Sequence, residues 1–327
     1  MTGAPTLVVG AGGLLGRAVV RRLTARRQPS LVHTIPWDRP AAATDALALA
    51  VRDLLTRAGT GPWRIAWCSG AGVTGTPASA LDQEITTFAA FLDEVTAQAG
   101  EPPPGSGLFY ASSAGGVYAG SGRAPFTELD EPAAISPYGQ AKLRSEQLVR
   151  AFAGRTGTPV LIGRIANLYG PGQNLDKPQG LVSHLCRSQI SGQPLSVYVP
   201  LDTTRDYLYV DDCAAMICDG LDRLGRERPT APVIKVLASQ QGVTIGTLLA
   251  EMRRLFKRAP RVVLGSSPFA KFQVRDLRLR SVVWPELDRR SLTPLGVGMK
   301  ATASDLLRAT QLGDRAADRR PVATALG

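Results

Sequence analysis

The stretch Thr6-Leu-Val-Val-Gly10-Ala-Gly-Gly13-Leu-Leu-Gly16 decides the fold that this sequence predicts. The apolar, partly β-branched run Thr6–Val9 predicts a strand, and the periodicity of Leu14–Arg27 predicts a helix directly after the glycines. Such a turn points backbone N–H groups and the positive end of a helix dipole at one place, which suits a pyrophosphate. A tight turn in an unrelated α/β protein would also use glycines, but the position directly after a strand favours nucleotide binding. We expect dinucleotide contacts from Gly10, Gly13, Leu14, Leu15 and Gly16.

Strand and helix patterns alternate along the first half of the chain. Because strands joined by helices of this length form βαβ units, the sequence predicts an α/β fold, a Rossmann doubly wound parallel sheet with helices on both faces. The strand candidates are Leu31–Trp37, Ile65–Cys68, Leu108–Ser112 and Val160–Ile165, and the helix candidates are Ala41–Ala58, Leu81–Ala99 and Tyr138–Ala153.

The alternation ends at Gly170-Pro171-Gly172, after which the segments are shorter and richer in Pro and Arg. We expect residues 1–169 to form the Rossmann dinucleotide-binding domain, and 206–237 to return to it through a helix at Val210–Leu224. Residues 170–205 and 238–327 are expected to form a small C-terminal α/β substrate-binding lobe. A chain of 327 residues is long enough for both units.

The composition excludes several classes of protein. With 44% hydrophobic and 20% charged residues, the chain is neither disordered nor collagen-like, and its four scattered cysteines predict no disulfide framework. The net charge of +11 lies mostly in residues 251–327 and raises the question of an acidic partner. The sequence shows no nucleic-acid motif, apolar run of membrane length, signal peptide or metal-binding cluster. We expect a reduced cytoplasmic protein without a metal and without a nucleic-acid or membrane partner.

Asp38 and Arg39 follow the second predicted strand, and Asp38 lies 22 residues after Gly16. An acid at this place would bind the adenosine ribose, although Asp38 could equally be a turn residue before Arg39-Pro40. A carboxylate repels a 2′-phosphate, so Asp38 favours NAD, whereas Arg39 could pair with that phosphate. The sequence therefore predicts NAD and leaves NADP possible.

Tyr138-Gly-Gln-Ala-Lys142 places a phenol and an ammonium on the same side of a predicted helix. A lysine ammonium stabilises a neighbouring phenolate, which can then exchange a proton with a substrate hydroxyl during hydride transfer. The lysine can also hold hydroxyl groups of the nicotinamide ribose. The alternative is a chance Tyr/Lys pair on an exposed helix, because a pattern of five residues is common.

Five motifs follow one another along roughly residues 5–215. They are Gly10–Gly16, Ser112–Tyr118, Ser136–Lys142, Gly163–Gly172 and Thr204–Asp212. In this order they resemble the motifs of the extended short-chain dehydrogenase/reductases of the NAD-dependent nucleotide-sugar epimerase/dehydratase family. Five motifs in the family's order make a chance resemblance improbable.

This resemblance implies that Tyr138 is the acid/base and that Lys142 is its partner and a cofactor ligand. The family also uses a serine or threonine hydroxyl, usually four residues before the Tyr of the Val-Tyr pair, and Ala114 stands at that position here. We expect Ser113 to take the role, with Ser112 in reserve. The remaining cofactor contacts implied are Cys68, Ser69, Gly70 and Ile165, with Cys68 acting as a small buried residue and not as a nucleophile.

The resemblance also implies a nucleotide-diphosphate sugar as substrate. Asn167 and Arg205 resemble the family's ligands to the diphosphate, and a guanidinium suits bidentate binding of phosphate. Gln179 and Leu181 lie where the family places substrate against the start of a helix, and Arg278 is a candidate second phosphate contact. A homodimer is expected through the helices Leu81–Ala99 and Tyr138–Ala153.

Two departures from the family pattern are visible. Ala41–Ala58 looks helical throughout, so the family's third strand is expected to be degenerate or missing. The family's dehydratases carry an Asp-Glu pair where this chain has Gly115-Gly116, so a 4,6-dehydratase is disfavoured.

These features favour an NAD-dependent nucleotide-sugar 4-epimerase that acts by transient oxidation at C4. An NAD(P)H-dependent reductase of nucleotide-4-keto sugars would use the same residues. A non-catalytic dinucleotide-binding protein of this fold is a weaker hypothesis, because such proteins usually lose Tyr138 or Lys142.

Overall fold

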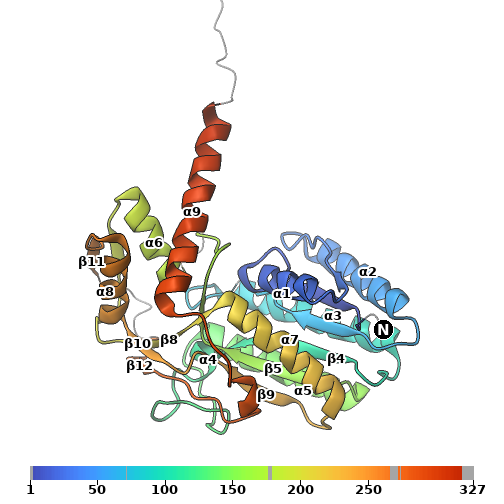
Figure 1. The fold of residues 1–327 in the computed structure, drawn as a ribbon. Coiled ribbons are helices and arrows are strands. Elements are labelled where there is room, and N and C mark those ends of the chain that lie inside the picture. Colours follow the sequence, from blue (N-terminus) through green and yellow to red (C-terminus); the bar gives the residue numbers. More distant parts are fainter. Residues whose placement is uncertain (1–2, 71, 176–178, 266–271, 273, 319–327) are drawn as a thin grey trace, which may run out of the picture.

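The computed structural model describes residues 3–70, 72–175, 179–265, 272 and 274–318. Its centre is a six-stranded parallel sheet in the order β2-β1-β3-β4-β5-β9 (Figure 1). The doubly wound α/β sheet that the sequence predicts is confirmed. The strands are β1 (Thr6–Val9), β2 (Ser30–Leu31), β3 (Arg64–Trp67), β4 (Gly107–Ser113), β5 (Val160–Ile165) and β9 (Val233–Leu237).

Helices cover both faces of this sheet because successive residues of a strand point to opposite faces. Val8 of β1 belongs to the hydrophobic core beneath α1 (Leu14–Ala25) and α7 (Val210–Glu227). Its neighbours Leu7 and Val9 belong to a second core on the other face. The helices of that face are α2 (Pro40–Ala58), α3 (Ala78–Ala99) and α5 (Pro137–Thr156).

The sheet ends at β2 on one side, and no strand lies beyond β2 in the part of the chain that the structure describes. The chain passes from β2 through α2 and returns as β3 on the other side of β1, so the expectation of a missing third strand is confirmed. The expected strand Leu31–Trp37 is wrong beyond Leu31. An edge strand has one neighbour only, and Pro36 has no N–H to donate, so the chain leaves the sheet early.

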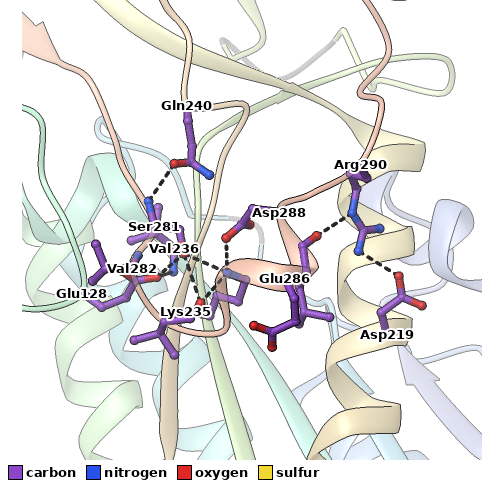
Figure 2. A network of polar contacts seen from close by, with 12 residues as sticks. Glu128, Asp219, Lys235, Val236, Gln240, Ser281, Val282, Glu286, Asp288 and Arg290 are labelled. Carbon is purple, nitrogen blue, oxygen red and sulfur yellow. Dashed lines mark hydrogen bonds and ion pairs between the residues drawn. The ribbon is translucent and has the colours of Figure 1, made fainter.

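A buried polar network holds β9, the strand at the opposite edge (Figure 2). The fully buried Lys235 Nζ donates to Ser281 Oγ and to Asp288 Oδ2, both at 2.8 Å. Glu128 accepts from the N–H of Val236 at 2.7 Å and from the Ser281 hydroxyl at 2.6 Å. These bonds fasten the chain that returns from the C-terminal half onto the edge of the sheet.

The second half of the chain builds smaller sheets around β8 (Thr204–Tyr209). β8 pairs with β6 (Asn167–Tyr169), β10 (Gly242–Thr244) and β12 (Asp276–Leu277), and β7 (Leu195–Val197) pairs with β11 (Val262–Leu264). The remaining elements are α4 (Ala114–Val117), α6 (Leu181–Ser191), α8 (Ile245–Phe256), the short 3-10 helix η2 (Pro285–Leu287) and α9 (Leu295–Asp318), which runs out from the body in Figure 1. The division of the chain into a dinucleotide-binding domain and a substrate lobe stays a prediction.

The alternation of residue types in Val274–Val283 indicates a strand, but only Asp276 and Leu277 pair with β8. The Asp276 side chain accepts the N–H of Arg278 at 3.1 Å and turns the backbone there. Beyond the turn, Leu279 makes a single bridge with Phe126. The local hydrogen bond therefore replaces the longer ladder that the alternating pattern suggests.

Candidate active site

The glycine turn has the geometry that a pyrophosphate needs. Gly10 adopts a φ of +86°, and its carbonyl oxygen accepts the N–H of Gly13 at 2.9 Å. Gly13 caps α1 in an extended conformation without any side-chain cap, so the first amides of the helix are left for a ligand. A Cβ on Gly16 would lie 2.2 Å from the Gly10 oxygen, which explains why only glycine fits the first turn of the helix. These residues fit the diphosphate of a dinucleotide.

Other strands end beside this turn, at the carboxyl edge of the sheet where ligands of such folds bind. Ser69 and Gly70 follow β3, and a Cβ on Gly10 would lie 2.7 Å from the Ser69 nitrogen. Burial raises the pKa of the Cys68 thiol, as expected for a packing residue and not for a nucleophile. Ile165 ends β5 and pairs in register with Ser113 at the end of β4.

Tyr138 and Lys142 lie one turn apart near the start of α5, which Ser136 caps by accepting the N–H of Gly139 at 3.1 Å. The Tyr138 ring is half-buried between the loop after β3 and the short helix α4, since a Cβ on Gly72 would lie 3.2 Å from it and a Cβ on Gly116 would lie 3.1 Å away. Lys142 Nζ lies 5.8 Å from the centre of the Tyr138 ring. The predicted phenol and ammonium are therefore neighbours, not a chance pair on an exposed helix.

The surroundings of Lys142 keep it charged. Its side chain is 7% exposed, and burial alone would lower the pKa of Lys142. Tyr110, Tyr138 and Glu84 oppose this effect and together hold the pKa of Lys142 above its ordinary value. A protonated lysine beside a phenol is the arrangement that stabilises a phenolate.

The two candidate serines have different surroundings. Ser113 is half-buried, and its hydroxyl oxygen accepts the N–H of Gly116 at 3.2 Å, where it caps α4 beside the Tyr138 ring. That bond uses the oxygen and leaves the hydroxyl proton to be donated to a ligand. Ser112 is 5% exposed and donates its proton to Glu146 at 2.6 Å. The geometry favours Ser113.

Ser112 belongs to a buried hydrogen-bond network in the core next to the site. Glu146 forms a salt bridge with Arg164 at 2.8 Å, with both side chains 3% exposed or less. Arg164 also donates to the hydroxyl of Tyr118 at 2.7 Å. The charges are paired within the core, so this network links β4, α5 and β5 and is not available for catalysis.

Asp38 and Arg39 are both exposed in the loop between β2 and α2, and Arg39 is the N-cap residue of α2. The structure thus leaves both side chains accessible to a ribose or its phosphate. Their position does not distinguish a ribose ligand from a turn residue, so the choice between them stays a prediction.

The residues expected to bind the diphosphate lie on neighbouring strands of the smaller sheet. Asn167 is exposed at the start of β6 and pairs in register with Tyr207 of β8, two residues after Arg205. Arg205 is 8% exposed, and burial lowers the pKa of its guanidinium, with Tyr207 and Asp276 acting in the opposite direction.

The other expected substrate contacts are more exposed. Arg278 pairs with Asp276 at 2.7 Å, with the arginine side chain 51% exposed. Gln179 is exposed, and Leu181 begins α6 next to the left-handed N-cap Gly180. Their roles stay predictions.

Two residues beside Lys142 escaped the sequence analysis. Lys142 Nζ lies 5.5 Å from the centre of the Tyr110 ring of β4 and 3.6 Å from Oε1 of Glu84 of α3. They are far from Lys142 in sequence and lie in no motif. Only the packing of α3, β4 and α5 brings them to the site.

Comparison with a family model gives a match over residues 6–228 to "Epimerase", the NAD dependent epimerase/dehydratase family. Two curated relatives are a dTDP-4-dehydro-6-deoxyglucose reductase from Escherichia coli, 28% identical over 158 residues, and a dTDP-L-rhamnose 4-epimerase from Burkholderia thailandensis, 37% identical over 94 residues. These alignments cover 48% and 28% of this chain and 48% and 26% of the relatives. The chain thus spans about half or less of the length of these relatives.

A solved structure, the Thermus thermophilus UDP-glucose 4-epimerase in complex with NAD, superposes with a TM-score of 0.76 at 19% identity. The superposition covers 93% of this chain and 99% of that protein, so the fold is shared over nearly the whole length. Within the described residues, every helix is too short or too polar to cross a bilayer.

Proposed function

Because this chain belongs to the NAD dependent epimerase/dehydratase family, we propose that it is a nucleotide-sugar 4-epimerase that uses NAD and takes Tyr138 as its acid/base. The observation that supports this most strongly is the neighbourhood of Tyr138, the buried Lys142 ammonium and Ser113 at the carboxyl edge of the sheet, beside the glycine turn. The family relationship favours NAD as the cofactor, the glycine turn fits the pyrophosphate that NAD and NADP share, and NADP is the alternative that Arg39 allows.

In this proposal each residue of the chain has one task. The Tyr138 phenolate accepts the proton of the sugar 4-hydroxyl. The same phenol returns the proton after the keto sugar has rotated in the site and presents its opposite face to the cofactor. Lys142 stabilises the phenolate, and Ser113 donates a hydrogen bond to the reacting oxygen. NAD, when bound through Gly10–Gly16, supplies a hydride acceptor and donor for C4.

The substrate is held away from the reacting carbon. Asn167 and Arg205 bind the diphosphate, with Gln179, Leu181 and Arg278 as further contacts. We also propose a homodimer through α3 and α5, which sedimentation of the purified protein would test.

A 4,6-dehydratase is disfavoured because the start of α4 carries Ala114, Gly115 and Gly116, none of which can donate or accept a proton through its side chain. A 4-keto-sugar reductase is the second candidate, because the E. coli reductase gives an alignment over 158 residues. Both reactions use the same Tyr138 and Lys142, so the product decides between them.

The test is a panel of UDP- and dTDP-hexoses incubated with the purified protein, with the ratio of C4 epimers followed by proton NMR. An epimerase interconverts the two epimers without net change in cofactor, retains NAD that is released on denaturation, and loses about 100-fold or more of its rate in Tyr138→Phe. Consumption of NAD(P)H with a 4-keto sugar, without epimer exchange, would reject the epimerase in favour of the reductase.

A further inference from the structure

The ammonium of Lys142 has a carboxylate beside it that the proposed reaction does not use. Glu84, near the start of α3, places Oε1 3.6 Å from Lys142 Nζ. Its side chain is 28% exposed, whereas that of Lys142 is 7% exposed. An ammonium that is this deeply buried is stable only with a counter-charge or hydrogen-bond partners, and Glu84 is the carboxylate in contact with it.

The same carboxylate holds the loop that follows β3. Glu84 Oε2 accepts the N–H of Gly72 at 3.2 Å. A Cβ on Gly70 would lie 3.1 Å from Lys142 Nζ and 3.2 Å from Glu84 Oε1, so this ion pair lies directly against the backbone at Gly70. Gly70 is one of the residues expected to contact the cofactor, and a Cβ on Gly72 would lie 3.2 Å from the ring of Tyr138.

We propose that Glu84 is a positioning residue, whose carboxylate holds the Lys142 ammonium and the Gly72 amide so that the cation, the loop after β3 and Tyr138 keep fixed places. This inference rests on the proposed function of Tyr138 as the acid/base. It adds a residue on a further element, α3, to a site otherwise built from α5, β4 and the glycine turn.

Glu84 also sets the charge that Tyr138 meets. The ionisable groups at this point are Tyr138 and Lys142 of α5, Tyr110 of β4 and Glu84 of α3. With Glu84 present, the carboxylate and the Lys142 ammonium nearly cancel each other. Ionisation of Tyr138 then gives this group of three side chains a net negative charge. Removal of the carboxylate charge removes its repulsion of a phenolate on Tyr138, so the ionised phenol becomes more favourable.

Two substitutions separate these roles. Glu84→Gln removes the charge but keeps an oxygen that can accept the Gly72 N–H, whereas Glu84→Leu removes both. Glu94→Gln, on the same helix and hydrogen-bonded to Gln98, is the matched control for a lost carboxylate. Ionisation of Tyr138 is followed by ultraviolet titration of the phenol in the protein, with Tyr138→Phe identifying its contribution, and NAD affinity is measured by calorimetry.

We expect Glu84→Gln to move the Tyr138 titration to lower pH by about one to two units, the effect of one charge several ångströms away at an effective dielectric of about 20. The acidic limb of any turnover should move in the same direction. Glu84→Leu should in addition weaken NAD binding about fivefold, the equivalent of about 1 kcal/mol for the lost hydrogen bond.

A titration of Glu84→Gln that coincides with that of Glu94→Gln and wild type would overturn the proposal, since a merely structural Glu84 would leave the phenol unchanged. Because the phenol titration requires no turnover, it tests Glu84 even if no sugar on the panel reacts. In that case the proposed function fails and the role of Glu84 beside Lys142 is still decided. If Glu84→Leu does not fold, Glu84→Gln carries the test.

Discussion

Asp206, within the Thr204–Asp212 motif, is a buried carboxylate with an incomplete set of partners. Its side chain is 1% exposed, and Oδ1 accepts the N–H and the hydroxyl of Ser239 at 2.8 and 2.9 Å. Oδ2 is buried without a hydrogen-bond partner among the described residues. Burial therefore dominates and raises the pKa of Asp206 to about 6, with the bonds from Ser239 acting in the opposite direction. We predict that Asp206→Asn changes the pH dependence of stability.

The sign and size follow from linkage. The ordinary pKa of the carboxyl is 3.8, so between about pH 4 and pH 6 the folded protein binds a proton that the unfolded chain has released. The free energy of unfolding therefore falls as the pH rises through this window. A shift from 3.8 to about 6 corresponds to a loss of about 3 kcal/mol above pH 6, because each unit of pKa is worth about 1.4 kcal/mol. Asparagine keeps the Oδ1 acceptor and carries no charge, so this loss should vanish.

The assay is urea unfolding followed by circular dichroism at about pH 4.5 and pH 8, with wild type and variant compared at each pH. We expect the stability of Asp206→Asn relative to wild type to be higher at pH 8 than at pH 4.5 by about 2 to 3 kcal/mol. Asp93→Asn, which removes a carboxylate that is 70% exposed, is the control and should change stability by less than about 1 kcal/mol at either pH. A difference between Asp206→Asn and wild type that does not vary with pH would refute the reasoning.

Three further substitutions test the site and its support. Gly16→Ala puts a methyl group 2.2 Å from a backbone oxygen of the glycine turn, so the NAD affinity measured by calorimetry should fall more than about tenfold. The control is Gly12→Ala, where a Cβ would meet nothing within 4 Å. This variant should fold, and unfold in urea, as wild type does. Lys235→Met leaves the Asp288 carboxylate, which is 10% exposed, without its cation and should lower the free energy of unfolding by about 3 to 5 kcal/mol, against less than about 0.5 kcal/mol for the exposed Lys300→Met. Ser113→Ala should lower the rate of C4 epimer exchange about 100-fold while the protein stays folded, and an unchanged rate would remove Ser113 from the proposed site.

The central sheet could be predicted from the sequence because its strands and helices have local signals. Thr6–Val9 and Val160–Ile165 have the predicted bounds, since each is rich in apolar or β-branched residues and ends at a turn or at the carboxyl edge of the sheet. The short strands at the edges of the sheets, β2 and β12, are harder to predict. The short β2 and the two-residue β12 depend on which neighbour is present and on local bonds such as that from Arg278 to Asp276, and a periodic pattern contains neither.

The candidate site divides in the same way. Tyr138 and Lys142 lie four residues apart on one helix, so their proximity follows from helix geometry alone. Glu84 comes from α3 and Tyr110 from β4, and no local rule brings them to Lys142. Ser112 and Ser113 are adjacent, and the sequence left them as alternatives. Successive side chains of a strand point to opposite faces of the sheet, so Ser112 faces Glu146 whereas Ser113 lies beside Gly116.

Part of the positive charge of the C-terminal quarter is neutralised locally. Several exposed arginines of the C-terminal quarter pair with nearby carboxylates, as Arg254 does with Glu251 and Arg278 does with Asp276. Such exposed pairs contribute little to stability and weaken the attraction of the surface for a distant anion. Arg205 differs in its burial, since it is 8% exposed and burial lowers the pKa of its guanidinium. A diphosphate bound there would meet a cation that water screens poorly, so we expect the affinity for a nucleotide sugar to depend on Arg205 far more than on the basic surface.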